Sequence, residues 1–188
     1  SLRTEVRLRS YIAILSSRAG NLDEAIDGYR RALELAERSG LSDVVASAAM
    51  NYGTACQQRG DGGPALDAYE RGLKMASALG KTSTALLLRY NMASLYAELG
   101  LFRRADELAA RALEEAEQTN QRSLDGPVSL LRGEIALARG ATNQARELFD
   151  AARAIFEEGG AQRELAETRL CLAEQALRGQ DGELQCAL

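Results

Sequence analysis

A glycine or an asparagine recurs at every twentieth residue along most of this 188-residue sequence. Both residue types tolerate the positive φ angle that the C-terminal cap of a helix requires. A cap at every twentieth residue predicts helices of about 16 to 18 residues joined by tight turns. The spacing comes from two interleaved series with a forty-residue period: Gly20, Gly60, Gly100 and Gly140, and Gly40, Gly80, Asn120 and Gly160.

Each forty-residue unit also keeps small and aromatic residues at fixed positions in both of its expected helices. Small residues let two helix backbones approach closely, and an aromatic ring fills the space beside them. The sequence therefore predicts one antiparallel helix pair per unit, with a buried face shared between neighbouring pairs. The positions are Ala13, Gly53, Ala93 and Gly133 in the first helices, and Ala25, Ala65, Ala105 and Ala145, Tyr29, Tyr69, Ala109 and Phe149, and Ala32, Gly72, Ala112 and Ala152 in the second helices.

The fold class that we predict is all-α, an α–α superhelix of antiparallel helix pairs with about nine helices. Abundant Ala, Leu, Glu and Arg favour helix, and an aromatic content of 5% argues against a β-rich fold. We expect one array over residues 1–188, with units 1–40, 41–80, 81–120 and 121–160 and a partial fifth unit, 161–188. Its helix, about Gln162 to Arg178, precedes either a truncation, which we favour, or a terminal cap at Gly179 to Leu188.

Polar residues near the expected helix starts fit the role of N-terminal caps. The candidates are Asn21 or Asp23, Asp61, Ser42 or Asp43, Thr82 or Ser83, and Asp125.

The periodic series of small residue, glycine, alanine, aromatic residue and alanine resembles the tetratricopeptide repeat. The resemblance covers residues 1–160 in four units, plus half a unit. The forty-residue length is similar to the extended class seen in kinesin light chain, mitotic-spindle adaptor proteins and bacterial signalling regulators. The resemblance implies a right-handed superhelix whose first helices line a concave groove, and this groove typically holds a segment of a partner protein.

Composition and motifs argue against an enzyme and against a metal or organic cofactor. The chain has no histidine, and its three cysteines, Cys56, Cys171 and Cys186, form no metal-ligand cluster. No glycine-rich phosphate loop follows a strand. We therefore predict no catalytic residue, no cofactor and no metal site.

Charge and hydropathy restrict the partners. The net charge of −4, with acids and bases interleaved, argues against nucleic acid as the ligand. The apolar runs are far shorter than a membrane span, and residues 1–10 carry three arginines and no signal-like stretch. The cysteines have the pattern of thiols in a reducing compartment, so we expect a cytoplasmic protein that contacts no membrane.

The repeat register predicts which side chains face the groove. Residues nine positions before the first glycine of each unit are Tyr11, Asn51, Asn91 and Leu131. In the extended class, an asparagine at this place often holds the backbone of a bound peptide, because its amide both donates and accepts a hydrogen bond. Asn51 and Asn91 match this pattern, whereas Tyr11 and Leu131 depart from it. A solvent-exposed helical asparagine is the alternative.

Neighbouring positions complete the expected groove. Arg7 and Arg18 make its N-terminal half polar, and we expect an apolar anchor toward the C-terminal half, unless further repeats cover those leucines. The additional contact residues that we predict are Met50, Tyr90, Leu87, Leu130, Arg7 and Arg18. The carboxylate clamp of chaperone-binding members is not matched, since only Asn51 fits it.

The leading hypothesis is a protein–protein interaction scaffold that binds a partner peptide or helix, as a segment of a larger bacterial signalling or regulatory protein. One alternative is self-association, as a weak homodimer through terminal repeats, with an apolar face at Leu170 and Leu172. Another alternative is a sensor of a small molecule or peptide signal.

Overall fold

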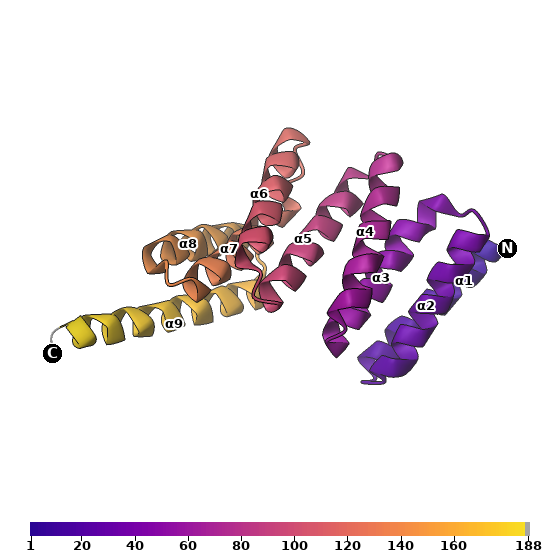
Figure 1. Cartoon of the computed structure of the whole chain (residues 1–188). Coiled ribbons are helices and arrows are strands. Elements are labelled where there is room, and N and C mark those ends of the chain that lie inside the picture. Colours follow the sequence, from indigo (N-terminus) through magenta and orange to yellow (C-terminus); the bar gives the residue numbers. More distant parts are fainter. Residues whose placement is uncertain (187–188) are drawn as a thin grey trace. The chain divides into compact units, whose positions relative to one another are not determined.

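The protein is all-α, as predicted. The structure, a computed structural model, describes the backbone of residues 1–186 and the side chains of residues 1–176, and this part contains helices and no strand. Figure 1 shows the helices in chain order. They are α1 (Leu2–Arg18), α2 (Leu22–Arg38), α3 (Ser42–Arg59), α4 (Gly62–Ala78), α5 (Thr82–Glu98), α6 (Phe102–Gln118), the 3₁₀ turn η1 (Arg122–Leu124), α7 (Asp125–Ala138), α8 (Thr142–Gly159) and α9 (Gln162–Cys186).

The eight predicted turns share one backbone design. Every periodic glycine, and Asn120 with a φ of 53°, adopts a positive φ. The N–H of the residue that follows each of them donates to the carbonyl five residues back, at 2.8 to 3.0 Å. The N–H of the glycine or asparagine itself donates to the carbonyl three residues back, at 2.9 to 3.3 Å. This pair of bonds is the Schellman motif, which satisfies carbonyls at the end of a helix. The turns that the sequence predicted are thus confirmed.

The predicted side-chain caps are largely absent. Asn21 and Asp61 do precede α2 and α4, but neither side chain makes a capping hydrogen bond. Their φ and ψ angles, near −85° and 68° for Asn21, differ from the extended conformation of an ordinary N-cap. Ser42, Thr82 and Asp125 are instead the first residues of their helices. The main chain, not a polar side chain, therefore closes these turns.

Close backbone approach within the helix pairs follows the predicted small-residue pattern. A Cβ atom on Gly53 of α3 would lie 2.6 Å from the ring of Tyr69 in α4, and one on Gly133 of α7 would lie 2.4 Å from the ring of Phe149 in α8. Both rings are fully buried. Only glycine leaves enough room for these rings at the centre of the pair.

The chain divides into two compact units, residues 1–95 and residues 96–188. The first holds α1 to α4 and most of α5, and one of its core clusters joins Val6, Leu33 and Val45 of α1, α2 and α3. The second holds α6 to α9, with a core built on Phe149, Phe156 and Leu165. A single array over all 188 residues stays a prediction.

The last helix differs from the expectation. We predicted an end near Arg178, but α9 continues to Cys186. A glycine costs only about 1 kcal/mol inside a helix, so Gly179 by itself does not force a turn.

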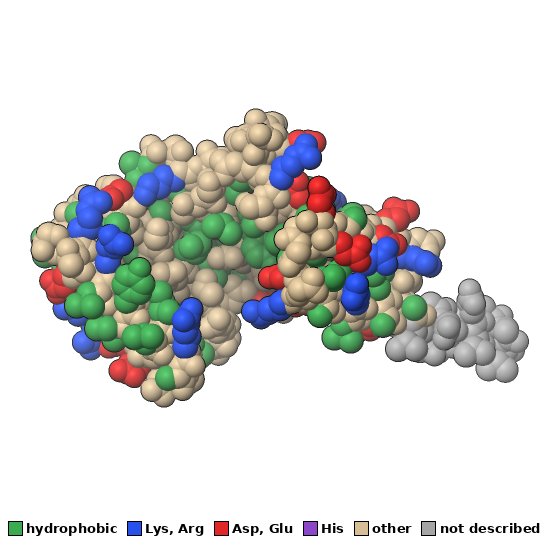
Figure 2. Space-filling model, turned by 180° about the vertical axis from the view of Figure 1, so that it is seen from behind, with side chains coloured by type: hydrophobic (Ala, Val, Ile, Leu, Met, Phe, Trp, Pro, Cys, Tyr) green, Lys and Arg blue, Asp and Glu red, His purple; other side chains and the backbone are tan. Residues whose placement is uncertain are grey.

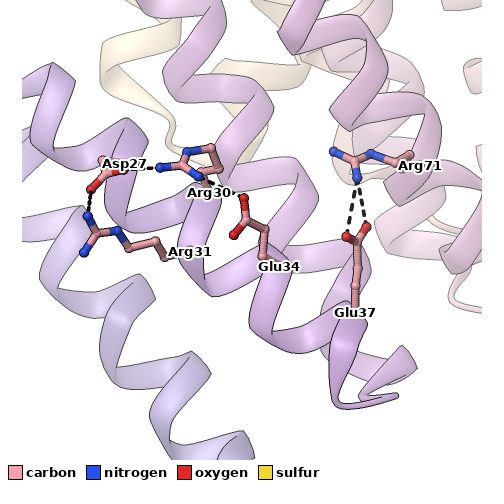
Figure 3. A network of polar contacts seen from close by, with 6 residues as sticks. All are labelled: Asp27, Arg30, Arg31, Glu34, Glu37 and Arg71. Carbon is pink, nitrogen blue, oxygen red and sulfur yellow. Dashed lines mark hydrogen bonds and ion pairs between the residues drawn. The ribbon is translucent and has the colours of Figure 1, made fainter.

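An ion pair links the second helices of the first two pairs. In the first unit, Arg71 of α4 donates to Glu37 of α2 at 3.1 Å, while Arg30 and Arg31 of α2 pair with acids on their own helix (Figure 3). These side chains are substantially exposed, so each pair contributes little to stability. None of the described helices combines the length and hydropathy that crossing a lipid bilayer requires.

Candidate functional site

Two adjoining hollows lie along the first helices of the first unit. The α1–α3 hollow has a volume of about 230 Å³ and combines apolar side chains with hydroxyl, amide and guanidinium groups. Its lining consists of Val6, Arg7, Ser10, Tyr11, Ile14, Val44, Ser47, Ala48 and Asn51. The periodic spacing of first helices explains this arrangement, because residues forty positions apart, such as Arg7 and Ser47 or Tyr11 and Asn51, face the same space.

The α3–α5 hollow continues this surface and is more polar. It has a volume of about 310 Å³, and its lining consists of Ser17, Tyr29, Met50, Asn51, Thr54, Ala55, Gln58, Leu87 and Asn91. Burial raises the pKa of the Tyr29 hydroxyl, and the positive charge of nearby Arg18 opposes that rise. The hydroxyl therefore stays neutral at physiological pH and serves as a hydrogen-bonding group.

The two predicted asparagines meet in this surface. Asn51 lines both hollows, and Asn91 lines the α3–α5 hollow with it. Both side chains are half-buried, and neither amide has a hydrogen-bond partner within the described part of the chain. Each amide thus presents one donor group and one acceptor to whatever enters the hollows.

The other groove residues predicted in the first unit line the hollows only in part. Arg7 and Tyr11 line the α1–α3 hollow, and Met50 and Leu87 line the α3–α5 hollow. Tyr90 is half-buried on α5 and lines neither of them, and Arg18 is exposed at the end of α1.

The structure contradicts the expectation that Leu130 and Leu131 form an apolar anchor in the groove. Leu130 and Leu131 are only 8% and 6% exposed, and Leu130 belongs to the hydrophobic core of the second unit. The reason is that α7 is buried around most of its circumference, so that consecutive residues from Val128 to Leu131 all lack exposure. Half-buried apolar lining is found instead in the first unit, at Ile14 and Val44.

Several lining residues were missed by the sequence register. Val44 and Gln58 line the hollows, although the register placed other positions of α3 there. Gln57, one residue before Gln58, is engaged elsewhere: its Oε1 accepts a hydrogen bond from the buried Tyr69 hydroxyl at 2.8 Å, and its amide donates to Ser94 at 3.4 Å. In the sequence, this contact is indicated by a polar residue, Gln57, in the helix before a tyrosine, Tyr69, that the repeat pattern places in the core.

Titratable groups outside the hollows include one thiol with a strongly shifted pKa. Partial burial, together with the carboxylates of Glu134, Glu167 and Glu174, raises the pKa of Cys171 to about 11. Its Sγ lies 3.9 Å from Glu134 Oε1. The thiolate form is therefore scarce near neutral pH, and Cys171 is a poor nucleophile.

We expect Cys171 to alkylate slowly. At pH 8, its reaction with iodoacetamide should be on the order of 100-fold slower than that of an unperturbed cysteine, because the thiolate fraction falls tenfold for each unit of pKa. Mass spectrometry on a variant with Cys56→Ala and Cys186→Ser isolates this thiol. The same variant in urea is the control and should react at the normal rate. A rate that levels off near pH 9 in the folded protein would contradict the shift.

Comparison with known proteins agrees with this repeat architecture. A family profile described as Tetratricopeptide repeat matches residues 5–78, which include the helices that line most of both hollows. Residues 5–78 carry tetratricopeptide repeats. The resemblance inferred from the periodic residues is therefore confirmed. No curated protein matches the chain.

Solved structures of tetratricopeptide-type proteins share the fold at low sequence identity. BtubC (BKLC) from P. vanneervenii is 21% identical with a TM-score of 0.80, and the match covers 96% of this chain and 75% of that one. A Rap protein complexed with Competence and Sporulation Factor is 16% identical with a TM-score of 0.81, over 95% of this chain and 50% of that one. A putative kinesin light chain repeat protein from Podosopora anserina is 16% identical with a TM-score of 0.77, over 98% and 92%.

Proposed function

We propose that this tetratricopeptide-repeat chain is a protein-interaction module that holds an extended peptide segment of a partner protein along the two hollows of its first unit. The observation that carries the proposal is the pair of half-buried amides, Asn51 and Asn91, that face the α3–α5 hollow with no protein partner in the described residues. A peptide backbone offers an N–H and a C=O at each residue and so matches both functions of an amide side chain.

The lining on either side of Asn51 indicates which peptide fits. The α1–α3 hollow offers Ile14 and Val44 to an apolar side chain, with the Arg7 guanidinium in the same lining. The α3–α5 hollow offers hydroxyl and amide groups, such as Thr54 and Gln58, to a polar side chain. A segment with an apolar residue beside a polar residue, flanked by an acid that reaches Arg7, is therefore the expected ligand.

Similar folds support a role in signalling. The Rap protein of similar fold is described as complexed with a factor, and another structural neighbour, from Pyrococcus horikoshii, is a signal transduction ATPase with a tetratricopeptide repeat sensor, of which this chain covers 27%. We accordingly place this chain in a larger cytoplasmic regulatory protein of a bacterium, as a non-enzymatic binding part.

Asparagine replacement tests the proposal. A displayed library of random dodecapeptides is selected on the wild-type chain, and the affinity of enriched peptides is measured by calorimetry. In the double variant Asn51→Ala, Asn91→Ala, the Kd should rise about 30-fold, because at least two hydrogen bonds of about 1 kcal/mol each are lost. Alanine is the better helix former, so the helices stay intact.

A matched control separates binding from a general effect of removing amides. The variant Asn21→Ala, Asn143→Ala removes two exposed asparagines that line neither hollow, and it should bind as the wild type does. An unchanged Kd in the Asn51, Asn91 variant would remove the backbone-holding role.

A further inference from the structure

The hydroxyl of Tyr29 is a polar group that the first unit places in the α3–α5 hollow without a protein partner. Tyr29 belongs to α2 and is only 7% exposed, yet it lines this hollow. Its hydroxyl makes no hydrogen bond within the described part of the chain. A buried polar group without a hydrogen bond costs free energy, and such groups are rare in native structures. The Tyr29 hydroxyl is therefore available to a group that enters the hollow.

The equivalent tyrosine of the next unit shows which partners are missing. Tyr69, forty residues later, donates its hydroxyl to Gln57 Oε1 at 2.8 Å and lies 3.3 Å from Thr54 Oγ1. The corresponding positions of α1 hold Ser17 and Ile14. Isoleucine offers no acceptor, and the shorter serine side chain lines the hollow without making a hydrogen bond to the tyrosine of its own unit. Helix α1 thus lacks the two partners that α3 supplies.

Charge around the Tyr29 hydroxyl favours a negatively charged group. None of the residues that line the α3–α5 hollow is charged. The positive charge of Arg18 acts on the hydroxyl, and Arg18 has no acidic partner among the described residues. Arg18 also holds the repeat position of Gln58, which lines this hollow. Figure 2 shows basic side chains beside hydrophobic ones at the surface of this N-terminal part of the molecule. A carboxylate in the hollow thus meets donors and no acid in the lining.

We propose that the α3–α5 hollow selects an acidic residue of the bound peptide, whose side-chain carboxylate accepts a hydrogen bond from the Tyr29 hydroxyl and forms an ion pair with Arg18. This inference rests on the proposed function, in which Asn51 and Asn91 hold the backbone of the same peptide. Aspartate or glutamate suits the site because a carboxylate only accepts hydrogen bonds, and bonds to an ionised group are the stronger ones. Burial raises the pKa of the Tyr29 hydroxyl, so it keeps its proton for this bond.

Parallel peptide selections test the acid preference. The displayed library of random dodecapeptides is selected on the wild-type chain and on Tyr29→Phe. Aspartate or glutamate should recur at one position of the wild-type peptides, and the Tyr29→Phe peptides should lose this preference. In the tightest wild-type peptide, replacing the acid by its amide should raise the Kd about tenfold on the wild type, as expected for a hydrogen bond to a charged group. On Tyr29→Phe the rise should be only about twofold, because the exposed pair with Arg18 alone remains.

A second variant fills the site from within the chain. Ser17→Gln supplies the acceptor that Gln57 gives to the other tyrosine, so it should abolish the acid preference while the Tyr29 hydroxyl is kept. Tyr96→Phe is the control, because it removes a half-buried hydroxyl that lines neither hollow, and it should retain the preference. Since Tyr29→Phe removes a hydroxyl without a protein partner, its urea midpoint should stay unchanged or rise.

The outcomes separate the acid site from the function on which it rests. Peptides that depend on Asn51 and Asn91 but show no acid preference overturn the acid site and leave the peptide-binding module. Equal losses on the wild type and on Tyr29→Phe do the same. A lower urea midpoint of Tyr29→Phe assigns the hydroxyl a structural role and also overturns the acid site. A selection that enriches no peptide removes both proposals.

Discussion

Replacement of Gly133 by valine should lower the free energy of unfolding of the second unit by about 3 kcal/mol, which is the upper range for overpacking a core. The new Cβ would start 2.4 Å from the ring of Phe149, and this ring is fully buried in the core of the pair. Neither the ring nor the backbone has space to move, so the two helices must separate. Urea unfolding followed by circular dichroism measures the loss, and hydrogen exchange locates it in α7 and α8.

Gly159 offers the matched control for this substitution. It also lies in a helix, α8, but a Cβ there meets nothing within 4 Å. Gly159→Val should therefore leave stability unchanged or raise it by a few tenths of a kcal/mol, since valine is the better helix former. Adding Phe149→Leu should restore part of what Gly133→Val loses. Equal effects at Gly159 and Gly133 would show that helix propensity, not the ring, decides.

Truncation of Tyr69 to alanine should destabilise the first unit by about 3–5 kcal/mol, the range for removing a buried aromatic side chain. The Tyr69 ring fills the space that Gly53 leaves between α3 and α4, and its hydroxyl donates to Gln57 at 2.8 Å. The alanine variant leaves a cavity that neighbouring helices fill only partly. Chemical denaturation with tyrosine fluorescence and circular dichroism provides the measurement.

Two further variants divide this loss into packing and hydrogen bonding. Tyr69→Phe keeps the ring and should cost only about 1 kcal/mol, from the lost bond to Gln57. Tyr11→Ala removes an exposed tyrosine and should change stability by less than about 0.5 kcal/mol. A Tyr69→Phe variant as unstable as Tyr69→Ala would mean that the hydroxyl, and not the ring, supports the pair.

Local rules explain why the turns and the helix pairs were predictable. A positive φ is nearly restricted to glycine and asparagine, so their period identified all eight turns. The pairing of Gly53 with Tyr69 and of Gly133 with Phe149 followed from their fixed offsets. Asn21 and Asp61 hold the N-cap positions, as predicted, but their side chains make no capping hydrogen bond. The turn imposes their backbone angles, and those angles are not visible in the residue type.

The candidate site was predictable in part for a related reason. The register placed Asn51 and Asn91 on one surface, and the structure brings them into one hollow. Burial of Leu130 and Leu131 depends on how neighbouring helices pack around α7, and one helix's own periodicity carries no information on that. The division of the hollows into a more apolar and a more polar space also depends on the positions of α1, α3 and α5 together.

The turns have a consequence for how such a chain changes over evolutionary time. Because main-chain bonds close each of them, the residue after the glycine or asparagine differs from turn to turn, from Asn21 to Leu41 to Asp61 to Gln121. A duplicated or deleted segment of one full period would rejoin the chain at an identical junction. Such a chain is therefore able to gain or lose whole repeats, while the side chains that line the hollows mutate independently of the turns.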